Sequence, residues 1–257
     1  MINILITLII LLYPLIFENS QQIVSETVLS VFPSPTPDAA GVLPERKILH
    51  NSYHVFQTFN NCGPAALSMA LSYFDIQKSQ QELGNILRPY QIADGNNDDK
   101  SVTLAEMGEL AKSYGLIPYH RPNGNVELIK EFINLDIPVI TRTWTKPNED
   151  IGHYRVVKGY DERKKTLTQD DSLQGKNRKY SYDEFNILWE KFNYEYLVLV
   201  PVEKDNQAKS ILKDNLDERR AWQIATENAE NKLTRNPNDT TSRFNYSIAL
   251  FNIGEFQ

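Results

Sequence analysis

The spacing of apolar residues predicts helices in the first half of the chain and strands in the second. Residues 62–74 carry apolar side chains three, four and seven positions apart, the stripe of a helix with one buried face. Further helices are expected at residues 79–87, 103–114 and 125–135, with Thr103 as an N-cap, Glu106 three residues later and Gly115 past the end. Runs rich in β-branched and aromatic residues then predict strands at 139–144, 153–160, 166–169 and 196–202, with a small helix at 182–189. Helices followed by an antiparallel sheet indicate an α+β fold.

The first 45 residues have a different texture. Residues 2–17 are apolar except for Asn3, Thr7, Tyr13 and Pro14, and no Lys or Arg precedes them. This run is long for a signal peptide and short for an average spanning helix, so residues 1–19 are either a signal peptide or an N-terminal membrane anchor. Both alternatives place the rest of the chain outside the cytoplasm, secreted or anchored to the membrane by this segment alone. Residues 20–45 are rich in Pro, Ser and Thr, which favours an extended linker.

The segment 204–257 is expected to be helical. Residues 205–235 are polar and rich in helix formers, and Pro237 ends that stretch before a second helix from residue 241. The lead-in 236–239 and the spacing Ala-Leu-x-x-x-Gly-x-Phe at 249–256 resemble the first helix and turn of a tetratricopeptide repeat. Such repeats occur in arrays, because one unit does not bury its own face. Two interpretations stay open: the start of a truncated array that recruits a protein partner, or a fortuitous likeness.

Composition and charge exclude several classes of protein. With 257 residues and 41% hydrophobic residues the chain can build a sizeable core, which excludes wholesale disorder. A formal net charge of −6 argues against a general nucleic-acid binder, which needs a basic surface. The single cysteine excludes an intrachain disulfide and a Cys-rich zinc site. Since no H-E-x-x-H spacing occurs either, we expect neither a metal nor a cofactor.

That single cysteine is the first candidate for chemistry. Cys62 begins the striped helix with Pro64 in its first turn, and the free N–H groups of a helix start favour a thiolate. Gly63 removes a side chain that would crowd a substrate carbonyl. Gln57, a short loop upstream, is placed to donate an amide N–H to an oxyanion. The alternative is that Cys62 only packs the start of a core helix.

A nucleophilic thiol needs a base, and His153 is the best placed of the four histidines. It opens a strand directly after Gly152, which leaves room for a ligand, whereas His50 and His54 lie in the approach to the domain and His120 in a polar loop. A catalytic histidine also needs an acceptor that orients its ring. The next strand ends in Asp170-Asp171, and if Leu167 faces the core, the two-residue period turns Asp171 inward and Asp170 outward. A solvated acidic turn is the alternative at this position.

Taken in order, these residues resemble a known family. The blocks are Gln57 with Asn61-Cys62-Gly63-Pro64-Ala65, then Gly152-His153-Tyr154 and Gly159-Tyr160-Asp161, then Asp171-Ser172 and residues 182–185. They are similar to the double-glycine, bacteriocin-processing cysteine peptidases, and more closely to the free-standing C39-like domains of the papain-like clan. The resemblance covers roughly residues 46–202, within a cysteine peptidase domain expected at residues 46–203. It implies a papain-like fold, with the nucleophile helix packed on an antiparallel sheet, and Cys62 as nucleophile, His153 as general base, Asp171 as orienting group and Gln57 as oxyanion donor.

The leading hypothesis is therefore an extracytoplasmic cysteine peptidase that acts on a peptide or protein substrate. Gly63 and Gly152 are expected to border the substrate. Asp170 remains an alternative to Asp171, because the two lie side by side. A second hypothesis is an inactive peptide-binding or scaffold module with a repeat-like tail, and a third is an acyltransferase that uses an amine in place of water. No Walker A pattern or transporter spans occur in the sequence, so transport-coupled leader cleavage is not implied.

Overall fold

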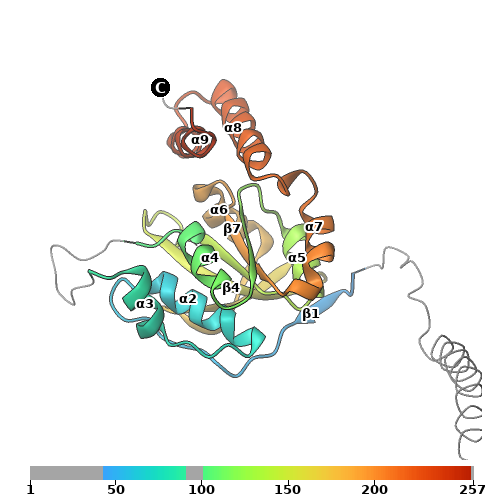
Figure 1. The fold of residues 1–257 in the computed structure, drawn as a ribbon. Coiled ribbons are helices and arrows are strands. Elements are labelled where there is room, and N and C mark those ends of the chain that lie inside the picture. Colours follow the sequence, from blue (N-terminus) through green and yellow to red (C-terminus); the bar gives the residue numbers. More distant parts are fainter. Residues whose placement is uncertain (1–42, 91–100, 256–257) are drawn as a thin grey trace, which may run out of the picture. The chain divides into compact units, whose positions relative to one another are not determined.

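The computed structural model describes residues 43–90 and 101–255, and its centre is one antiparallel sheet (Figure 1). The strand order is β2-β7-β3-β4-β5-β6, with β1 pairing with β4. All described strand pairs are antiparallel, which confirms the α+β class. The strands are β1 (Arg46–Ile48), β2 (Ile117–Arg121), β3 (Val139–Trp144), β4 (Gly152–Asp161), β5 (Thr166–Asp171), β6 (Gly175–Ser181) and β7 (Tyr196–Val200).

Local sequence explains where the helices begin. Ser79, Thr103 and Ser181 each accept a hydrogen bond from the backbone of a glutamate three residues later, whose side chain returns the contact, so each forms a capping box. Past the third predicted helix, Gly115 has a φ of +82°, a left-handed conformation that glycine adopts without strain. The helices are α2 (Cys62–Leu71), α3 (Gln80–Leu87), α4 (Leu104–Lys112), α5 (Val126–Asn134), α6 (Tyr182–Trp189), α7 (Asp205–Leu212), α8 (Glu218–Arg235) and α9 (Thr240–Ile253).

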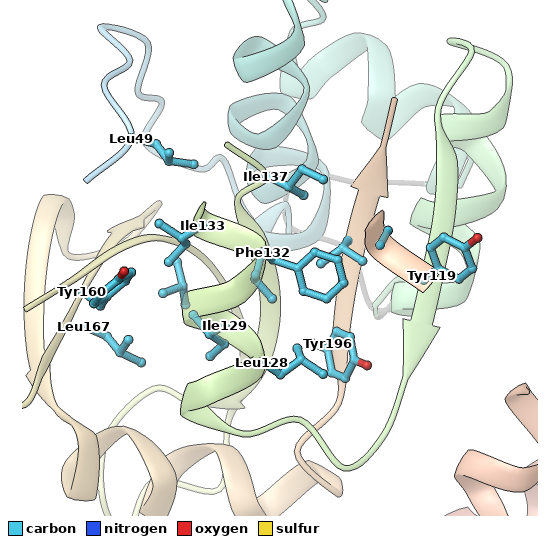
Figure 2. Close-up of a cluster of buried hydrophobic side chains, with 14 of the residues drawn as sticks. Leu49, Tyr119, Leu128, Ile129, Phe132, Ile133, Ile137, Tyr160, Leu167 and Tyr196 are labelled. Carbon is cyan, nitrogen blue, oxygen red and sulfur yellow. The ribbon is translucent and has the colours of Figure 1, made fainter. Parts of the chain in front are cut away.

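Two apolar cores lie on the two faces of the sheet. Val139 and Val157 belong to the core that includes α5 and α6, whereas their neighbours Ile140 and Val156 belong to the core formed with α2 and α4. This alternation is what a pleated strand requires. Figure 2 shows the first core, where Phe132 and the aliphatic residues of α5 pack among side chains of the sheet. The second core buries α2 from Gly63 to Leu71 and so holds the cysteine at its start in place.

The structure departs from the sequence predictions in three places. Strands β1, β2 and β6 were not expected, and His120 lies in β2 rather than in a polar loop. β2 contains Pro118 and Arg121, and β6 is polar and partly exposed at the end of the sheet, so neither shows the apolar alternation of a half-buried strand. The stretch 205–235 is also two helices, α7 and α8, with a short 3₁₀ turn at Lys213–Asn215 between them.

The two C-terminal helices pack on each other and on the sheet domain. Trp222 and Ala225 of α8 meet Ala249 and Ile253 of α9 in a small apolar cluster. Asn245 of α9 donates from Nδ2 to the carbonyl of Glu190 at 2.7 Å. Its own carbonyl accepts from Asn193 Nδ2 at 2.9 Å. These bonds fix α9 beside the segment that precedes β7, and the resemblance to a tetratricopeptide repeat stays a prediction.

The predicted export segment at 1–19 and most of the predicted linker at 20–45 lie outside the described residues. Within residues 43–90 and 101–255, no helix combines the length and apolar character needed to span a membrane.

Candidate active site

The start of α2 is shaped by a buried polar residue that leaves the helix end open. Asn61 precedes Cys62 and is fully buried, but its side chain makes no capping bond to the helix. Instead Asn61 Oδ1 accepts from Arg88 Nη1 at 2.7 Å, and Asn61 Nδ2 donates to Thr58 Oγ1 at 2.8 Å. The first N–H groups of the helix, including that of Cys62, therefore receive no side-chain cap and are placed to act on a neighbouring negative charge.

The environment of the thiol works in two directions. Burial raises the pKa of the Cys62 thiol above its ordinary value, and this effect prevails over the backbone N–H groups of Tyr154, Gly63 and Cys62 itself, which lower it. The positive charge of Arg88 also acts to lower it. The helix start alone therefore does not produce a free thiolate here, which differs from the sequence expectation. A second group must take the proton.

His153 and Asp171 are brought together by the pairing of β4 with β5. His153 Nε2 lies 2.9 Å from Asp171 Oδ1, and both side chains are almost fully buried. The register pairs Arg155 with Asp171, so the carboxylate lies two residues along β4 from the histidine and on the same face. With Nε2 facing Asp171, Nδ1 is the ring nitrogen left for a reaction partner.

The carboxylate of Asp171 is held on both oxygens. Oδ2 accepts from Arg155 Nε at 2.8 Å, and Oδ1 accepts from the backbone N–H groups of Leu173 at 2.7 Å and Gln174 at 2.9 Å. Burial acts to raise the pKa of Asp171, but the hydrogen bond from His153, the charges of His153 and Arg155 and the Gln174 N–H outweigh it and hold that pKa well below its usual range. Asp171 is therefore an ionised acceptor that orients the imidazole.

Cys62 lies beside this pair, since its sulfur is within the influence of the N–H of Tyr154, the residue after His153. Among the residues that the structure describes, no hydrogen bond joins the sulfur to His153. The arrangement thus places the thiol at the start of β4, the end of the strand that carries His153. A hydrogen bond between the sulfur and the His153 ring has to form before a proton can pass, as is common when substrate binds.

Gln57 is oriented by Ser172, the residue after Asp171. Ser172 Oγ donates to Gln57 Oε1 at 2.8 Å, and the Gln57 backbone N–H donates to the Ser172 carbonyl at 3.0 Å. Because the amide oxygen is the atom that Ser172 holds, the Nε2 donors of Gln57 point elsewhere. An amide fixed in this way is suited to donate to an oxyanion.

The two glycines near the site have different surroundings. A Cβ on Gly63 would lie 2.2 Å from Val102 Cγ2, so close packing between α2 and Val102 requires glycine there. This packing is a reason for Gly63 that the sequence did not reveal. Gly152 is exposed, and a Cβ there would lie 3.2 Å from the Phe192 ring, so glycine leaves room for that ring at the start of β4.

Asp170 is turned away from His153, but the prediction that it points outward into solvent is wrong. It is fully buried, with Oδ2 accepting from Lys158 Nζ at 2.7 Å and Oδ1 accepting from the Asn177 N–H at 2.8 Å. The acidic pair therefore ends in two buried carboxylates on opposite faces of β5, and of the two only Asp171 contacts His153. The solvated-turn alternative fails for the same reason.

Sequence reasoning missed Arg155 and His54. Arg155 is fully buried and grips Asp171, while His54 Nε2 lies 3.0 Å from the Asp171 carbonyl oxygen. A charged residue inside an apolar strand was the one available signal for Arg155. Within residues 43–90 and 101–255 no three His, Cys, Asp or Glu residues gather in a way that could hold a metal ion.

This geometry is accompanied by a family match. Residues 46–197 match the model of the Peptidase_C39 like family. The chain belongs to that family. Membership supports a peptidase, a hydrolase of peptide bonds, and the resemblance seen in the Cys-Gly-Pro-Ala and Gly-His-Tyr blocks is thereby confirmed.

One solved structure shows the same fold, and two others are similar at lower scores. A putative C39-like peptidase from Bacillus anthracis matches with a TM-score of 0.50 and 18% identity over 61% of this chain and 98% of its own. The peptidase domain of Streptococcus ComA, a bifunctional ABC transporter involved in quorum sensing, matches with a TM-score of 0.45 and 21% identity over 57% and 96%. A double-glycine-motif protease from an AMS/PCAT transporter, solved with its leader peptide, matches with a TM-score of 0.42 and 20% identity over 58% and 91%. No curated protein matches the chain.

Proposed function

We propose that this chain is an extracytoplasmic cysteine peptidase that cleaves peptide bonds through Cys62, His153 and Asp171. The observation that carries the proposal is the buried His153–Asp171 pair, 2.9 Å apart, at the start of β4, where the backbone N–H of Tyr154 acts on the Cys62 sulfur. The ionised carboxylate of Asp171, itself held on both oxygens, bonds to Nε2 of the buried imidazole. That bond fixes the orientation of the ring and so the direction in which Nδ1 points. This is the arrangement a general base needs.

The reaction follows from these positions. His153 Nδ1 takes the proton of the Cys62 thiol, and the sulfur attacks the carbonyl carbon of the scissile peptide. The Cys62 N–H and Gln57 Nε2 donate to the oxyanion of the tetrahedral intermediate. His153 then gives its proton to the leaving amine as the C–N bond breaks, which leaves a thioester. Water loses a proton to His153, attacks the thioester carbon and releases the carboxylic acid, and the thiol is restored.

The raised pKa of the thiol assigns a definite task to His153. Burial makes a lone thiolate unfavourable, so the negative charge on sulfur has to form together with the positive charge on the imidazole. Asp171 stabilises that imidazolium, and the residues that hold Asp171 ionised keep it available.

A pooled peptide library with a mass-spectrometric readout tests the proposal without a known substrate. Wild type is expected to generate new termini, and Cys62→Ser and His153→Ala to lose at least about 10³-fold of that activity. His50→Ala is the matched control, because His50 is an exposed histidine outside the site. Equal product patterns from wild type and Cys62→Ser would overturn the proposal.

A non-catalytic peptide-binding module is the second candidate. It is favoured by the raised pKa of the Cys62 thiol, which opposes formation of a thiolate. In that case the library is bound but not cleaved, and Cys62→Ser binds it as wild type does. An acyltransferase would instead form amide products when a primary amine is added to the reaction.

We also propose that the N-terminal segment exports the chain. Its apolar run is the support for this assignment, and the C-terminal helices are proposed to offer a surface for a protein partner. Fractionation of cells that express the full chain is expected to find it outside the cytoplasm. A chain that remains cytoplasmic would contradict the assignment.

A further inference from the structure

A pocket lies beside the start of β4, between the sheet domain and α9. Its volume is about 290 Å³, and its walls include the rings of Trp144, Phe192 and Phe244, with Lys191 and Thr241 between them. We call it the α9 pocket. It is just below the range of about 300–1,000 Å³ typical of small-ligand sites, which suits one side chain rather than an extended ligand.

The α9 pocket begins one residue away from His153. Trp144 is the register partner of Gly152 in the β3–β4 pair, and the Phe192 ring lies 3.2 Å from where a Gly152 Cβ would stand. The pocket is therefore on the β3 side of the histidine. Asp171 and the Gln57–Ser172 contact are on the β5 side.

This placement determines which part of a substrate reaches the pocket. In the proposed reaction the carbonyl oxygen faces Gln57, while the leaving nitrogen faces His153, which protonates it. The chain that follows the scissile bond thus departs on the side of His153 away from Gln57. The α9 pocket lies on that side.

The walls define the chemistry of the occupant. Lys191 Nζ donates to Thr241 Oγ1 at 3.2 Å and lies 4.8 Å from the centre of the Trp144 ring, so its charge is already engaged by its neighbours. Asp150 adds an exposed carboxylate at the pocket, and the two opposite charges favour no net charge in the occupant. Three aromatic rings favour a flat or bulky apolar side chain, which they contact edge-to-face or by stacking.

We infer that the α9 pocket binds an aromatic or bulky aliphatic side chain of the substrate, carried by the leaving-group side of the scissile bond. This inference rests on the proposed peptidase activity. It assigns α9, which lies outside the family match at 46–197, a part in substrate selection. Phe244 contributes from α9 and is half exposed, at 49%, as a wall open to a ligand must be.

The test compares wild type, Phe244→Ala and Phe251→Ala on a randomised peptide library. Phe251 is the matched control, because it is an exposed phenylalanine on the same helix that does not line the pocket. Wild type and Phe251→Ala are expected to enrich aromatic and large aliphatic residues after the cleaved bond. In Phe244→Ala this enrichment falls by about 3- to 10-fold, the effect of one lost aromatic contact, while cleavage before glycine is unchanged.

A binding experiment separates this inference from the peptidase proposal. Immobilised Cys62→Ser and its Phe244→Ala double variant are incubated with the same library, and the retained peptides are sequenced. If no variant cleaves but Cys62→Ser retains aromatic peptides in a Phe244-dependent way, the peptidase proposal fails and the pocket stands. If wild type and Phe244→Ala both cleave and show the same preference for the residue after the cleaved bond, the pocket assignment is overturned and the peptidase proposal stands.

Discussion

Replacing Arg155 by methionine tests how the candidate site is built. The Arg155 side chain is fully buried and donates to four groups. Besides Asp171 Oδ2 at 2.8 Å, it reaches the carbonyls of Trp144 and Thr145, each at 2.7 Å, and the Thr143 hydroxyl. Methionine keeps much of the length and removes every donor, so a buried carboxylate loses its compensating charge.

The expected loss in stability is large. Removing one partner of a buried ion pair costs about 3–5 kcal/mol, because the charge left behind remains buried. The free energy of unfolding, measured by urea titration at neutral pH, is expected to fall by this amount in Arg155→Met. Lys158→Met is the matched control, since Lys158 forms the corresponding buried pair with Asp170 on the other face of β5 and should lose a similar amount.

The rate of peptide hydrolysis is expected to differ between Arg155→Met and Lys158→Met. Arg155 fixes the carboxylate that orients His153, and a misplacement of about 1 Å costs on the order of 10²-fold in rate. Arg155→Met is expected to lose at least about tenfold in turnover under conditions where both variants are folded, while Lys158→Met stays near wild type. A stability loss below about 1 kcal/mol in Arg155→Met, or equal rate losses in the two variants, would refute this account.

Three further changes have expected outcomes. Hydrogen bonds from Lys130 and Lys165 lower the pKa of Glu162 to about 2. The stabilisation by the ionised Glu162 is therefore present above its ordinary pKa and is lost as the pH falls toward 2. In urea titrations from pH 5 to pH 2, the free energy of unfolding should decline less steeply in Glu162→Gln than in wild type. Gly63→Ala forces a Cβ to within 2.2 Å of Val102 Cγ2 and should cost about 1–3 kcal/mol in thermal unfolding, and adding Val102→Ala should recover part of it; an unchanged melting temperature for the single variant would contradict the packing. Ser172→Ala removes the hydrogen bond that holds the Gln57 amide oxygen. It should slow library cleavage by less than Gln57→Ala, for which the loss of an oxyanion donor predicts a decrease of about 10²–10³-fold. A larger decrease in Ser172→Ala than in Gln57→Ala would contradict the assignment of Gln57 as the donor and Ser172 as the residue that positions it.

Much of the helical and central strand structure could be predicted from local sequence. The bounds of β3 and α6 match the predicted 139–144 and 182–189, because β3 is rich in β-branched residues and α6 begins at a capping serine. The predicted cap at Thr103 is present for the same local reason. The polar strands β2 and β6 were missed, since only their partners in the sheet give them an extended conformation.

The sequence predicts a site residue correctly where the two-residue period of a strand determines which face its side chain occupies. Leu167 is buried, and Asp171 lies on the same face of β5, as the two-residue period requires. The burial of Asp170 was not predictable, because its partner Lys158 lies at a register shift between β4 and β5 that the sequence does not reveal. Buried charges need partners from another strand, and those pairings exist only after the sheet has formed.

The most direct test of the account is the pH dependence of Cys62 alkylation by iodoacetamide in wild type and His153→Ala. Because burial raises the pKa of the Cys62 thiol, the variant is expected to react only at a pH higher than an ordinary thiol, with a pKa of about 8.5, requires. Wild type, where His153 takes the proton, is expected to react at a lower pH than the variant. Superimposed profiles for the two proteins would contradict the claim that His153 activates Cys62.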